Sequence, residues 1–314
     1  MQINKFSNND TDFVEITNSS GMRIVLSSLG ASIFSISINN VPMTSHPIEV
    51  KDFKRKDIYQ GKTIGPISNR IKNGVVLLNN KEYQLDRNEF PNTLHGGDNG
   101  YSNQVFDCQI KGNIISYKLN YKGNLPGTSK VEVKYTIEEN ENAFDIDMSV
   151  ESNEDTFIAM TNHSYFSLGE RNIDNLSLSI PSNKYIETNP NNLIPERILN
   201  IIPCLDFNLS KKVMKDINNL YLINHKTKGY DHCFLLDNTR ITLESDNYKL
   251  DIYTDFPAVH IYSDNYENNA IMENSINLTH RGIAIEPEEN LLDIPLLKVG
   301  DIYYHKIRYQ FIKK

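Results

Sequence analysis

The sequence predicts an all-β protein, built as a large antiparallel sandwich or barrel. Two observations favour this class. Apolar and polar residues alternate along many short segments, as half-buried strands require, and clusters of Asn, Asp, Gly and Pro separate these segments. Segments with helical spacing are scarce, which argues against a fold that alternates strands with helices.

In chain order, the first clear strand is IISYKLNY (114–121). The next two, SKVEVKYTIEE (129–139) and AFDIDMSVES (143–152), also alternate, and the short ENEN segment between them predicts a hairpin. The same period predicts three further strands, at 175–180, 248–254 and 303–312. One segment, KKVMKDINNLYLI (211–223), has helical spacing and is predicted to be a short helix.

The chain is long enough to bury a sizeable core, with 314 residues of which 39% are hydrophobic. It contains no repeat of fixed period, no low-complexity tract and no linker marked by a change in composition. We therefore expect a single domain over residues 1–314.

Charge and cysteine content narrow the class of partner. The net charge of −8 opposes a nucleic-acid footprint, so a small molecule or a protein is the expected partner. Cys108, Cys204 and Cys233 form no paired motif, which favours a reducing compartment over a disulfide framework. Since the start of the chain is polar and no apolar run is long enough to span a bilayer, we expect a cytoplasmic protein that does not enter membranes.

Short polar stretches interrupt the strand pattern at places far apart in the sequence. Each lies at the end of a predicted strand or in a turn, and such ends can converge on one rim or concave face of a sandwich. The stretches are GPISNRIKNG (65–74), NTLHGG (92–97), TNHSYFSLG (161–169), GYDHCFLL (229–236) and RGIAIEPEENLLD (281–293).

Two of these stretches offer groups suited to proton transfer. Glu286 follows the apolar run 282–285, so partial burial is expected to raise its pKa toward the range useful for a general base. His163 carries the side chain that titrates nearest to neutral pH. Taken singly, Glu286 could equally be an ion-paired surface residue and His163 a hydrogen-bonded core residue.

The other stretches offer binding groups. Asn69 and Arg70 supply donors for hydroxyl or carboxylate oxygens, and His95 precedes two glycines where the backbone can approach a ligand. Asp231 could accept hydrogen bonds from two sugar hydroxyls. Each also has a purely structural explanation: a surface ion pair for Arg70, a glycine turn at His95, an Asx turn at Asp231.

Taken together and in this order, the stretches resemble the aldose 1-epimerase family, the galactose mutarotases, over essentially the whole chain. Lesser similarities are Gly30-Ala31, Pro126-Gly127, Pro195 and Asp206-Phe207. The resemblance is carried mainly by Asn69-Arg70-Ile71 between Gly65 and Gly74, Leu94-His95-Gly96-Gly97, Thr161 to Phe166, Tyr230-Asp231-His232 and Glu286.

The resemblance implies a galactose mutarotase-like supersandwich that binds a free hexose, glucose or galactose, on its concave face. It implies that Glu286 is the general base on the anomeric hydroxyl and His163 the general acid on the ring oxygen. The positions Asn69, Arg70, His95 and Asp231 would hold or polarise the sugar. Thr161, Asn162 and Ser164 would then set the orientation of His163.

The chemistry agrees with these roles, because ring opening removes a proton from O1 and delivers one to the ring oxygen. A carboxylate and an imidazolium on opposite sides of that bond complete the step, so neither a metal nor another cofactor is expected. The expected partner is a monosaccharide, and the expected assembly a monomer or homodimer.

Some positions depart from the family pattern. His260 stands where the family usually has a glutamine, which could alter contacts to the sugar, so His260 joins the substrate-binding candidates. Phe106 stands where tryptophan is common, and since the chain has no tryptophan, any stacking on the sugar must use Tyr or Phe. Pro66 stands where the family often has an arginine after the glycine that matches Gly65. Asp293 is displaced by one residue from the position of the family's usual Pro-Asp.

Other functions remain open at this level. A non-catalytic carbohydrate-binding protein could share the fold, although it would not need both proton-transfer groups. An epimerase of a phosphorylated hexose would need a cluster of Arg and Lys, and a glycoside hydrolase would need two facing carboxylates, for instance Glu286 and Asp231. The residue types at His95, His163, Asp231 and His260 also permit a metal site, although their spacing does not indicate one.

Overall fold

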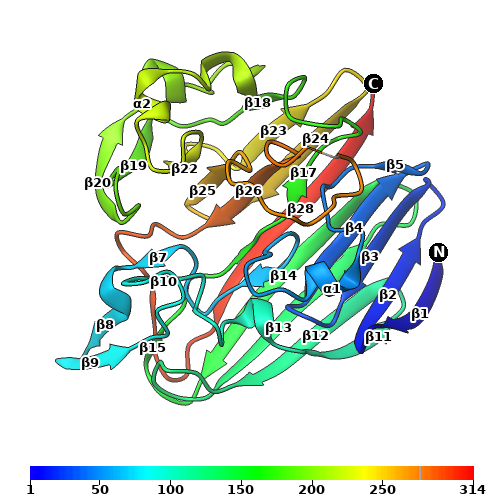
Figure 1. Ribbon diagram of the computed structural model, residues 1–314. Helices are drawn as coiled ribbons and strands as arrows, with labels where there is room; N and C mark the ends of the chain where they lie inside the picture. The colour runs from blue at the N-terminus through cyan, green and yellow to red at the C-terminus, as the bar shows by residue number, and fades with distance from the viewer. Residues whose placement is uncertain (276) are drawn as a thin grey trace.

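Antiparallel sheets form most of the protein, as the sequence predicts (Figure 1). The structure is a computed structural model and describes residues 1–275 and 277–314. The N-terminal sheet runs in the order β1 (Gln2–Asn8), β2 (Thr11–Thr17), β3 (Met22–Ser27), β4 (Ser32–Ile38) and β5 (Val41–Pro42). It forms the blue layer in Figure 1.

The large sheet combines strands from the middle and the end of the sequence. Its order is β11 (Asp107–Lys111), β12 (Ile114–Tyr121), β13 (Ser129–Ile137), β14 (Ala143–Ser152), β28 (Tyr303–Lys313), β24 (Tyr248–Thr254), β23 (Arg240–Glu244), β18 (Ser177–Ser179) and β21 (Lys211–Lys212). The last strand in the chain, β28, pairs with β14 on one side and with β24 on the other. It therefore joins two groups of strands that do not pair with each other directly within the described residues.

The third sheet, here named the site sheet, carries several of the predicted site residues. Its order is β17 (Tyr165–Phe166), β26 (Ile283–Glu288), β25 (Ala258–Tyr262), β22 (Asp231–Leu235), β19 (Lys184–Thr188) and β20 (Pro195–Asn200). Its central strands are buried along their whole length or nearly so, which explains why they lack the alternation seen in half-exposed strands.

One continuous apolar core fills the space between the sheets. Ile24 of the N-terminal sheet, Val133 of the large sheet and Ile285 of the site sheet belong to the same cluster of buried side chains. On β13 the core residues alternate with partly exposed ones such as Glu132 and Lys134. The period-two pattern in the sequence thus corresponds to the inner and outer faces of a sandwich.

The hairpin and the later strands agree closely with the predictions. β13 and β14 pair antiparallel, with Val133 opposite Met148, and β12, β24 and β28 match the predicted ranges. The strand predicted at 175–180 is shorter, since β18 covers Ser177–Ser179.

The helix predicted at 211–223 is wrong. This segment contains β21, a 3₁₀ turn over Val213–Asp216 and the single-turn helix α2 (Leu220–Ile223). The side chain of Asn219 accepts a hydrogen bond from the backbone N–H of Tyr221 and so starts a new helix inside the predicted one. Val213 and Ile217 are buried four residues apart, which is a helix-like spacing and explains why the pattern misled the prediction.

Short paired strands and turns complete the fold. The pairs are β6 (Thr63–Ile64) with β16 (Thr161–Asn162), β7 (Arg70–Ile71) with β10 (Thr93–Leu94), β8 (Val75–Leu78) with β9 (Lys81–Gln84), and β15 (Thr156–Phe157) with β27 (Leu296–Leu297). The remaining elements are α1 (Val50–Phe53) and 3₁₀ turns at Lys72–Gly74, Tyr101–Asn103 and Pro203–Leu205. Among the described residues, no helix has the length and hydropathy that crossing a bilayer would require.

Candidate active site

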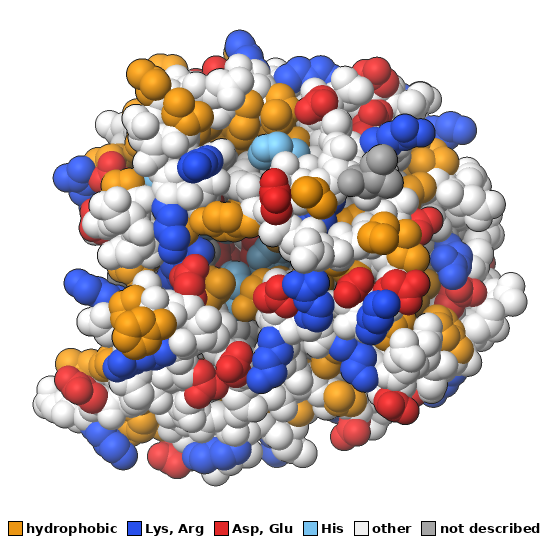
Figure 2. Space-filling view, in the orientation of Figure 1, with side chains coloured by type: hydrophobic (Ala, Val, Ile, Leu, Met, Phe, Trp, Pro, Cys, Tyr) orange, Lys and Arg blue, Asp and Glu red, His pale blue; other side chains and the backbone are white. Residues whose placement is uncertain are grey.

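The predicted site residues line one cavity. Its volume is about 330 Å³, and it opens between the site sheet and the loops around β7 and β10. The space-filling view shows a hollow with histidine side chains inside it and charged side chains around it (Figure 2). The predicted residues among its lining are Asn69, Arg70, His95, His163, Asp231, His260 and Glu286.

Strand register on the site sheet positions Glu286. On β26, Ile283 and Ile285 point into the core, so the alternate residue Glu286 points to the opposite face. His260 of β25 lies directly opposite Glu286 in the ladder and therefore shares that face. Glu286 is a residue within β26, and it is 1% exposed.

His163 is held by its backbone between β16 and β17. Its N–H donates to the Lys62 carbonyl at 2.9 Å, and its carbonyl accepts from the Gly61 N–H at 2.9 Å. A side chain at Gly61 could not be accommodated, because a Cβ there would lie 1.7 Å from the Ile33 carbonyl oxygen. This close packing fixes the chain that carries the imidazole.

Two tyrosines enclose the His163 ring. The Tyr165 ring stacks on it with centroids 5.1 Å apart, and the Tyr59 ring lies at 5.9 Å and nearly parallel. Asn162 and Ser164 bond elsewhere, since Asn162 donates to the Gly61 carbonyl and Ser164 donates to the Asn162 side chain. These polar neighbours support the backbone, while the aromatic rings contact the imidazole.

His163 and Glu286 are in direct contact. Nε2 of the histidine lies 3.3 Å from Oε1 of the glutamate, and both side chains are buried. The remaining polar atoms, His163 Nδ1 and Glu286 Oε2, have no hydrogen-bond partner among the described residues. Unpaired buried polar atoms are uncommon and call for an explanation, such as a ligand that would complete them.

Burial determines where the proton of this pair resides. It lowers the pKa of His163 to about 3 and raises the pKa of Glu286 well above its ordinary value. The shared proton therefore sits on the carboxyl group, and the imidazole is neutral. The expectation that His163 would titrate near neutral pH is corrected in this respect, because the ring is fully desolvated.

Asn69 and His95 come from two loops that bond to each other. The Asn69 N–H donates to His95 Nδ1 at 3.1 Å, and the His95 N–H donates to the Asn69 carbonyl at 3.0 Å. Both residues adopt positive φ, at 59° and 54°. Burial keeps the pKa of His95 well below its ordinary value, so its ring is neutral with the proton on Nε2, free to donate to a ligand.

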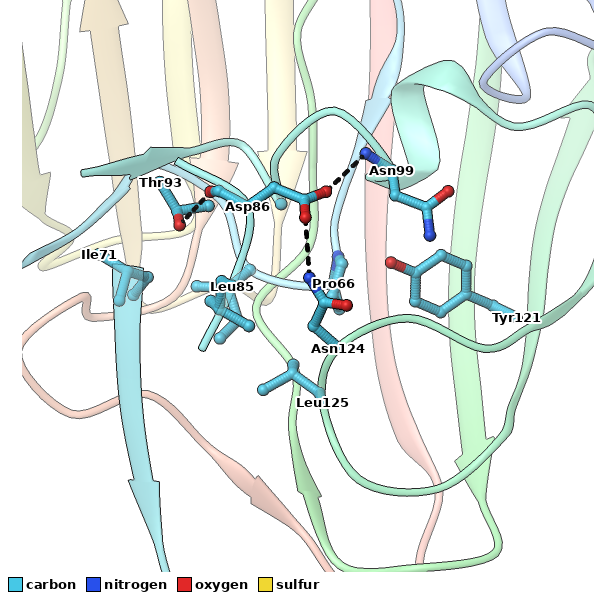
Figure 3. A pocket seen from close by; sticks show the side chains of 11 residues that line it. Pro66, Ile71, Leu85, Asp86, Thr93, Asn99, Tyr121, Asn124 and Leu125 are labelled. Carbon is cyan, nitrogen blue, oxygen red and sulfur yellow. Dashed lines mark hydrogen bonds between the residues drawn. The ribbon is translucent and has the colours of Figure 1, made fainter. Parts of the chain in front are cut away.

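The loop that carries His95 is anchored from behind by Asp86 (Figure 3). The Asp86 carboxylate accepts hydrogen bonds from the Asn99 N–H at 3.2 Å and the Asn124 side chain at 2.9 Å. Its carbonyl accepts from Thr93 Oγ1 at 2.5 Å. The cavity beside these residues is only about 10 Å³, too small for a sugar, so this region supports the site from outside.

Arg70 is buried and forms two ion pairs. Its Nε lies 2.7 Å from Glu89 Oε2, and its Nη1 lies 3.8 Å from Asp231 Oδ2. The structural alternative for Arg70 was a surface ion pair. Arg70 is indeed ion-paired, but it lies in the wall of the cavity.

Asp231 starts β22 and contacts His260. His260 Nε2 lies 2.6 Å from Asp231 Oδ1. Burial would raise the pKa of Asp231, but the hydrogen bond from His260 and the charge of Arg70 hold it below its ordinary value. Burial would lower the pKa of His260, but its bonds to Asp231, Cys233 and Glu288 raise it well above its ordinary value.

Cys233, His260 and Glu288 are the group of potential metal ligands found among the described residues, with ligand atoms within 4.8 Å of one another. Burial raises the pKa of the Cys233 thiol to about 12, so the thiol stays protonated. A protonated thiol beside a histidine-carboxylate pair fits a hydrogen-bonded cluster better than a metal site, which needs a thiolate. The residue types had also permitted a metal site made of His95, His163, Asp231 and His260. Their ligand atoms do not come together as such a group in the part of the chain that is described.

Sequence reasoning missed several residues of the cavity. Tyr59 and Glu89 lie in loops with no distinguishing pattern. Tyr165 lies within a recognised motif, but nothing in the sequence indicates its contact with the imidazole. Glu288 was detectable, because it lies two residues after Glu286 on the same strand and therefore on the same face.

Comparisons with known proteins show which family the chain belongs to. The sequence model of the family described as aldose 1-epimerase matches residues 12–310. Galactose mutarotase of Mus musculus is 27% identical, with 84% of this chain and 82% of the mouse protein covered. Aldose 1-epimerase of Haemophilus influenzae is 24% identical, with 95% of each chain covered.

Solved structures support the fold. The crystal structure of galactose 1-epimerase from Lactobacillus acidophilus superposes with a TM-score of 0.87 at 23% identity, covering 99% of this chain and 98% of that one. An aldose epimerase homologue from C. elegans gives a TM-score of 0.85 at 23% identity, covering 96% and 99%. The expected galactose mutarotase-like sandwich is confirmed, and the match of the family model over nearly the whole length shows that this chain belongs to the aldose 1-epimerase family.

Proposed function

We propose that the protein interconverts the α and β anomers of a free aldohexose such as glucose or galactose, with Glu286 and His163 exchanging protons with the sugar. The observation that carries this proposal is the buried contact between these two side chains, at 3.3 Å, in the wall of a cavity of about 330 Å³. Each has a polar atom without a partner among the described residues, available to a ligand.

The closeness of the pair suits the substrate. The hydroxyl O1 and the ring oxygen of an aldopyranose are bonded to the same carbon, so a base for one and an acid for the other must be neighbours. The chemistry of ring opening led us to expect the two groups on opposite sides of the scissile bond, whereas here they lie side by side. A sugar seated above the pair could contact Glu286 through O1 and His163 through the ring oxygen.

The protonation states of Glu286 and His163 change together with the cyclic and open-chain forms of the sugar. With the cyclic sugar, carboxylate Glu286 takes the O1 proton while imidazolium His163 protonates the ring oxygen, and the C1 bond to the ring oxygen breaks. Glu286 is then protonated and His163 neutral, which is the distribution that burial favours. After rotation about C1–C2, the neutral histidine takes the hydroxyl proton, the ring oxygen attacks the other face of C1, and Glu286 returns a proton to O1.

The remaining predicted residues would hold the sugar. The Nε2–H of neutral His95 can donate to a sugar oxygen, and the Asp231 carboxylate can accept from hydroxyl groups. The Asn69 amide contacts His260 with one polar atom and can bond to the sugar with the other. Arg70 can donate while it also keeps Asp231 ionised.

The charge of the cavity favours an uncharged sugar over a phosphorylated one. Arg70 is the single Lys or Arg among the described lining residues, and it is already paired with Glu89. Several carboxylates also line the cavity, namely Asp57, Glu89, Asp231, Asp264 and Glu267, and the first four are paired with arginines. Among the described lining residues, no unpaired Lys or Arg is therefore left to bind a phosphate.

The same contacts bear on the hydrolase alternative. A glycoside hydrolase needs a second carboxyl group facing the first across the substrate. Asp231 is engaged by His260 and Arg70, and the group that contacts Glu286 is a histidine. A proton-transfer isomerase accounts for His163, whereas a hydrolase leaves it without a role.

Polarimetry of freshly dissolved α-glucose and α-galactose tests the proposal. Wild-type protein is expected to speed the approach to anomeric equilibrium above the buffer rate, and Glu286→Gln is expected to return it to background. A panel that adds glucose 6-phosphate addresses substrate class, with the phosphate ester expected to react more slowly. A wild-type rate equal to that of buffer for every aldose would rule out the epimerase and favour a non-catalytic sugar-binding protein.

A further inference from the structure

The geometry points to His260 and Glu288 as a buried charged pair that positions Asp231 and sets the electrostatic environment of Glu286, without either residue touching the sugar. This inference rests on the proposed function, because it concerns how the same site is tuned. It also revises the expectation that His260 replaces a glutamine as a direct contact to the substrate.

Both ring nitrogens of His260 are already engaged by the protein. Nε2 lies 2.6 Å from Asp231 Oδ1, and Nδ1 lies 3.4 Å from Glu288 Oε1. The side-chain amide of Asn69 is 3.0 Å from the same Nδ1, a contact that an imidazolium makes through the amide oxygen. The ring is 5% exposed. No polar atom of this side chain is left for a sugar hydroxyl, although the ring lines the cavity.

Glu288 is buried, and no Lys or Arg of the described chain pairs with it. It is 0% exposed, and its contacts are the His260 ring, the Ser68 hydroxyl at 3.0 Å and the Asn69 amide at 3.5 Å. A carboxylate in such a place is costly unless a cation compensates it. An imidazolium at position 260 supplies that charge to Glu288 and to Asp231 together.

The pair also acts on Glu286 across the ladder. His260 lies opposite Glu286, and Glu288 is the next residue on the same face of β26. Among the charges around Glu286, His260 opposes its protonation and Glu288 favours it. The two effects offset each other, so removing one member alone disturbs the base more than removing both.

Other groups also face His260. From β22 these are Asp231 and Cys233, from β26 Glu286 and Glu288, from the loop before β7 Asn69, and across the cavity His95, His163 and Arg70. Asp231 and Glu288 are the carboxylates whose oxygens lie within ion-pair distance of the ring among the described residues. The charge of His260 therefore depends chiefly on these two.

The decisive experiment compares His260→Gln, Glu288→Gln and the double variant by pH–rate profiles of anomer interconversion. For His260→Gln we expect kcat at pH 7 to fall by about 10- to 100-fold, and the limb of the profile controlled by Glu286 to move upward by about one pH unit, because Glu288 is left uncompensated. In the double variant the two glutamines form a neutral pair, and kcat and the position of the limb should return to within about fivefold and a few tenths of a pH unit of wild type.

A matched control is His305→Gln, which also removes a histidine that contacts a glutamate, here Glu289, outside the cavity. Its profile should keep the wild-type shape. If His260→Gln raised KM with kcat and the profile unchanged, His260 would be a direct sugar contact and the inference would fail. The inference would fail equally if the double variant were as impaired as His260→Gln.

A measurement without substrate separates this inference from the proposed function. NMR of the His260 imidazole in resting wild-type protein should show it protonated up to at least about pH 8, and Glu288→Gln should lower its titration midpoint. A neutral ring at about pH 7 overturns the charged pair even in an active enzyme. If the His260 ring is protonated but the protein accelerates the interconversion of no aldose, the charged pair of His260 and Glu288 is supported and the proposed epimerase activity is ruled out.

Discussion

Two histidine-glutamate contacts in this protein have the same components, yet the pKa values of their histidines shift in opposite directions. His163 and Glu286 meet at 3.3 Å in the cavity, and His305 and Glu289 meet at 2.8 Å outside it. Each imidazole also stacks on an aromatic ring, Tyr165 in the first case and Phe256 in the second. Yet the pKa of His163 falls to about 3, while the pKa of His305 is raised.

Solvent and a second carboxylate account for the difference. The His305 side chain keeps 19% of its surface exposed and also hydrogen-bonds Asp255 at 3.1 Å. The His163 side chain is 5% exposed and has a single carboxylate neighbour in contact within the described chain. One carboxyl group is therefore insufficient to keep a dry imidazole charged, and burial places the proton of the pair in the cavity on Glu286.

The largest expected effect is on kcat, which should depend on the His163–Glu286 pair and not on the His305–Glu289 pair. His163→Asn should lower kcat by about 10²- to 10⁴-fold, because it removes one proton-transfer partner, whereas His305→Gln should change kcat less than about twofold. Polarimetry under matched conditions measures both. Comparable losses in the two variants would mean that His163 contributes through stability and not through chemistry.

The next effect concerns the pH dependence of stability. In the wild type, folded Glu286 holds a proton that it would lose when unfolded above pH 4.5, and folded His163 lacks one that it would gain below pH 6.5. Between these values the pair binds one proton in either state, so its contributions to the slope cancel. His163→Asn leaves Glu286 alone, and stability relative to wild type should then fall by up to about 1.4 kcal/mol per pH unit as pH rises through this window.

Urea unfolding at half-unit pH steps would measure that slope. The double variant His163→Asn with Glu286→Gln serves as control, since it removes both titrations and should restore the wild-type slope. A difference between His163→Asn and wild type that does not vary with pH would show that Glu286 is not protonated in the folded variant.

The smallest effect concerns the outer pair. The raised pKa of folded His305 means that its stabilisation is complete below the unfolded value of 6.5 and is lost as pH rises through the folded value. His305→Gln should therefore destabilise the protein by about 1 kcal/mol at about pH 6 and by less at about pH 9. Equal destabilisation at both pH values, by urea unfolding, would show that the loss comes from packing against Phe256 alone.

The half-buried strands were predictable from the sequence, and the buried ones were less so. β13 and β28 alternate because one face meets the core and the other meets solvent. β22 lies deep between neighbouring strands, so DHCFL carries no period and is recognisable only as a polar stretch. The helix at 211–223 failed because helical spacing of buried residues does not reveal where a cap interrupts the backbone.

For the candidate site, residue types and motif order were enough to select groups that line one cavity. Their charge states were not predictable. The sequence offered His163 as a neutral-pH titrating group and His260 as a sugar contact, and only burial and neighbours reveal a neutral ring in one case and a charged, fully engaged ring in the other. Tyr59 and Tyr165 contact His163 through three-dimensional proximity, which local sequence does not encode, whereas the alternation along β26 was enough to place Glu288 on the same face as Glu286.

The central place of β28 has a consequence for how the polypeptide matures. Because β28 separates β14 from β24, the large sheet cannot close while residues 303–313 are still inside the ribosome. Until then the nascent chain presents two open strand edges, which are surfaces prone to misassociation. These two edges are covered together when β28 inserts between them, so closure of the large sheet depends on this single strand.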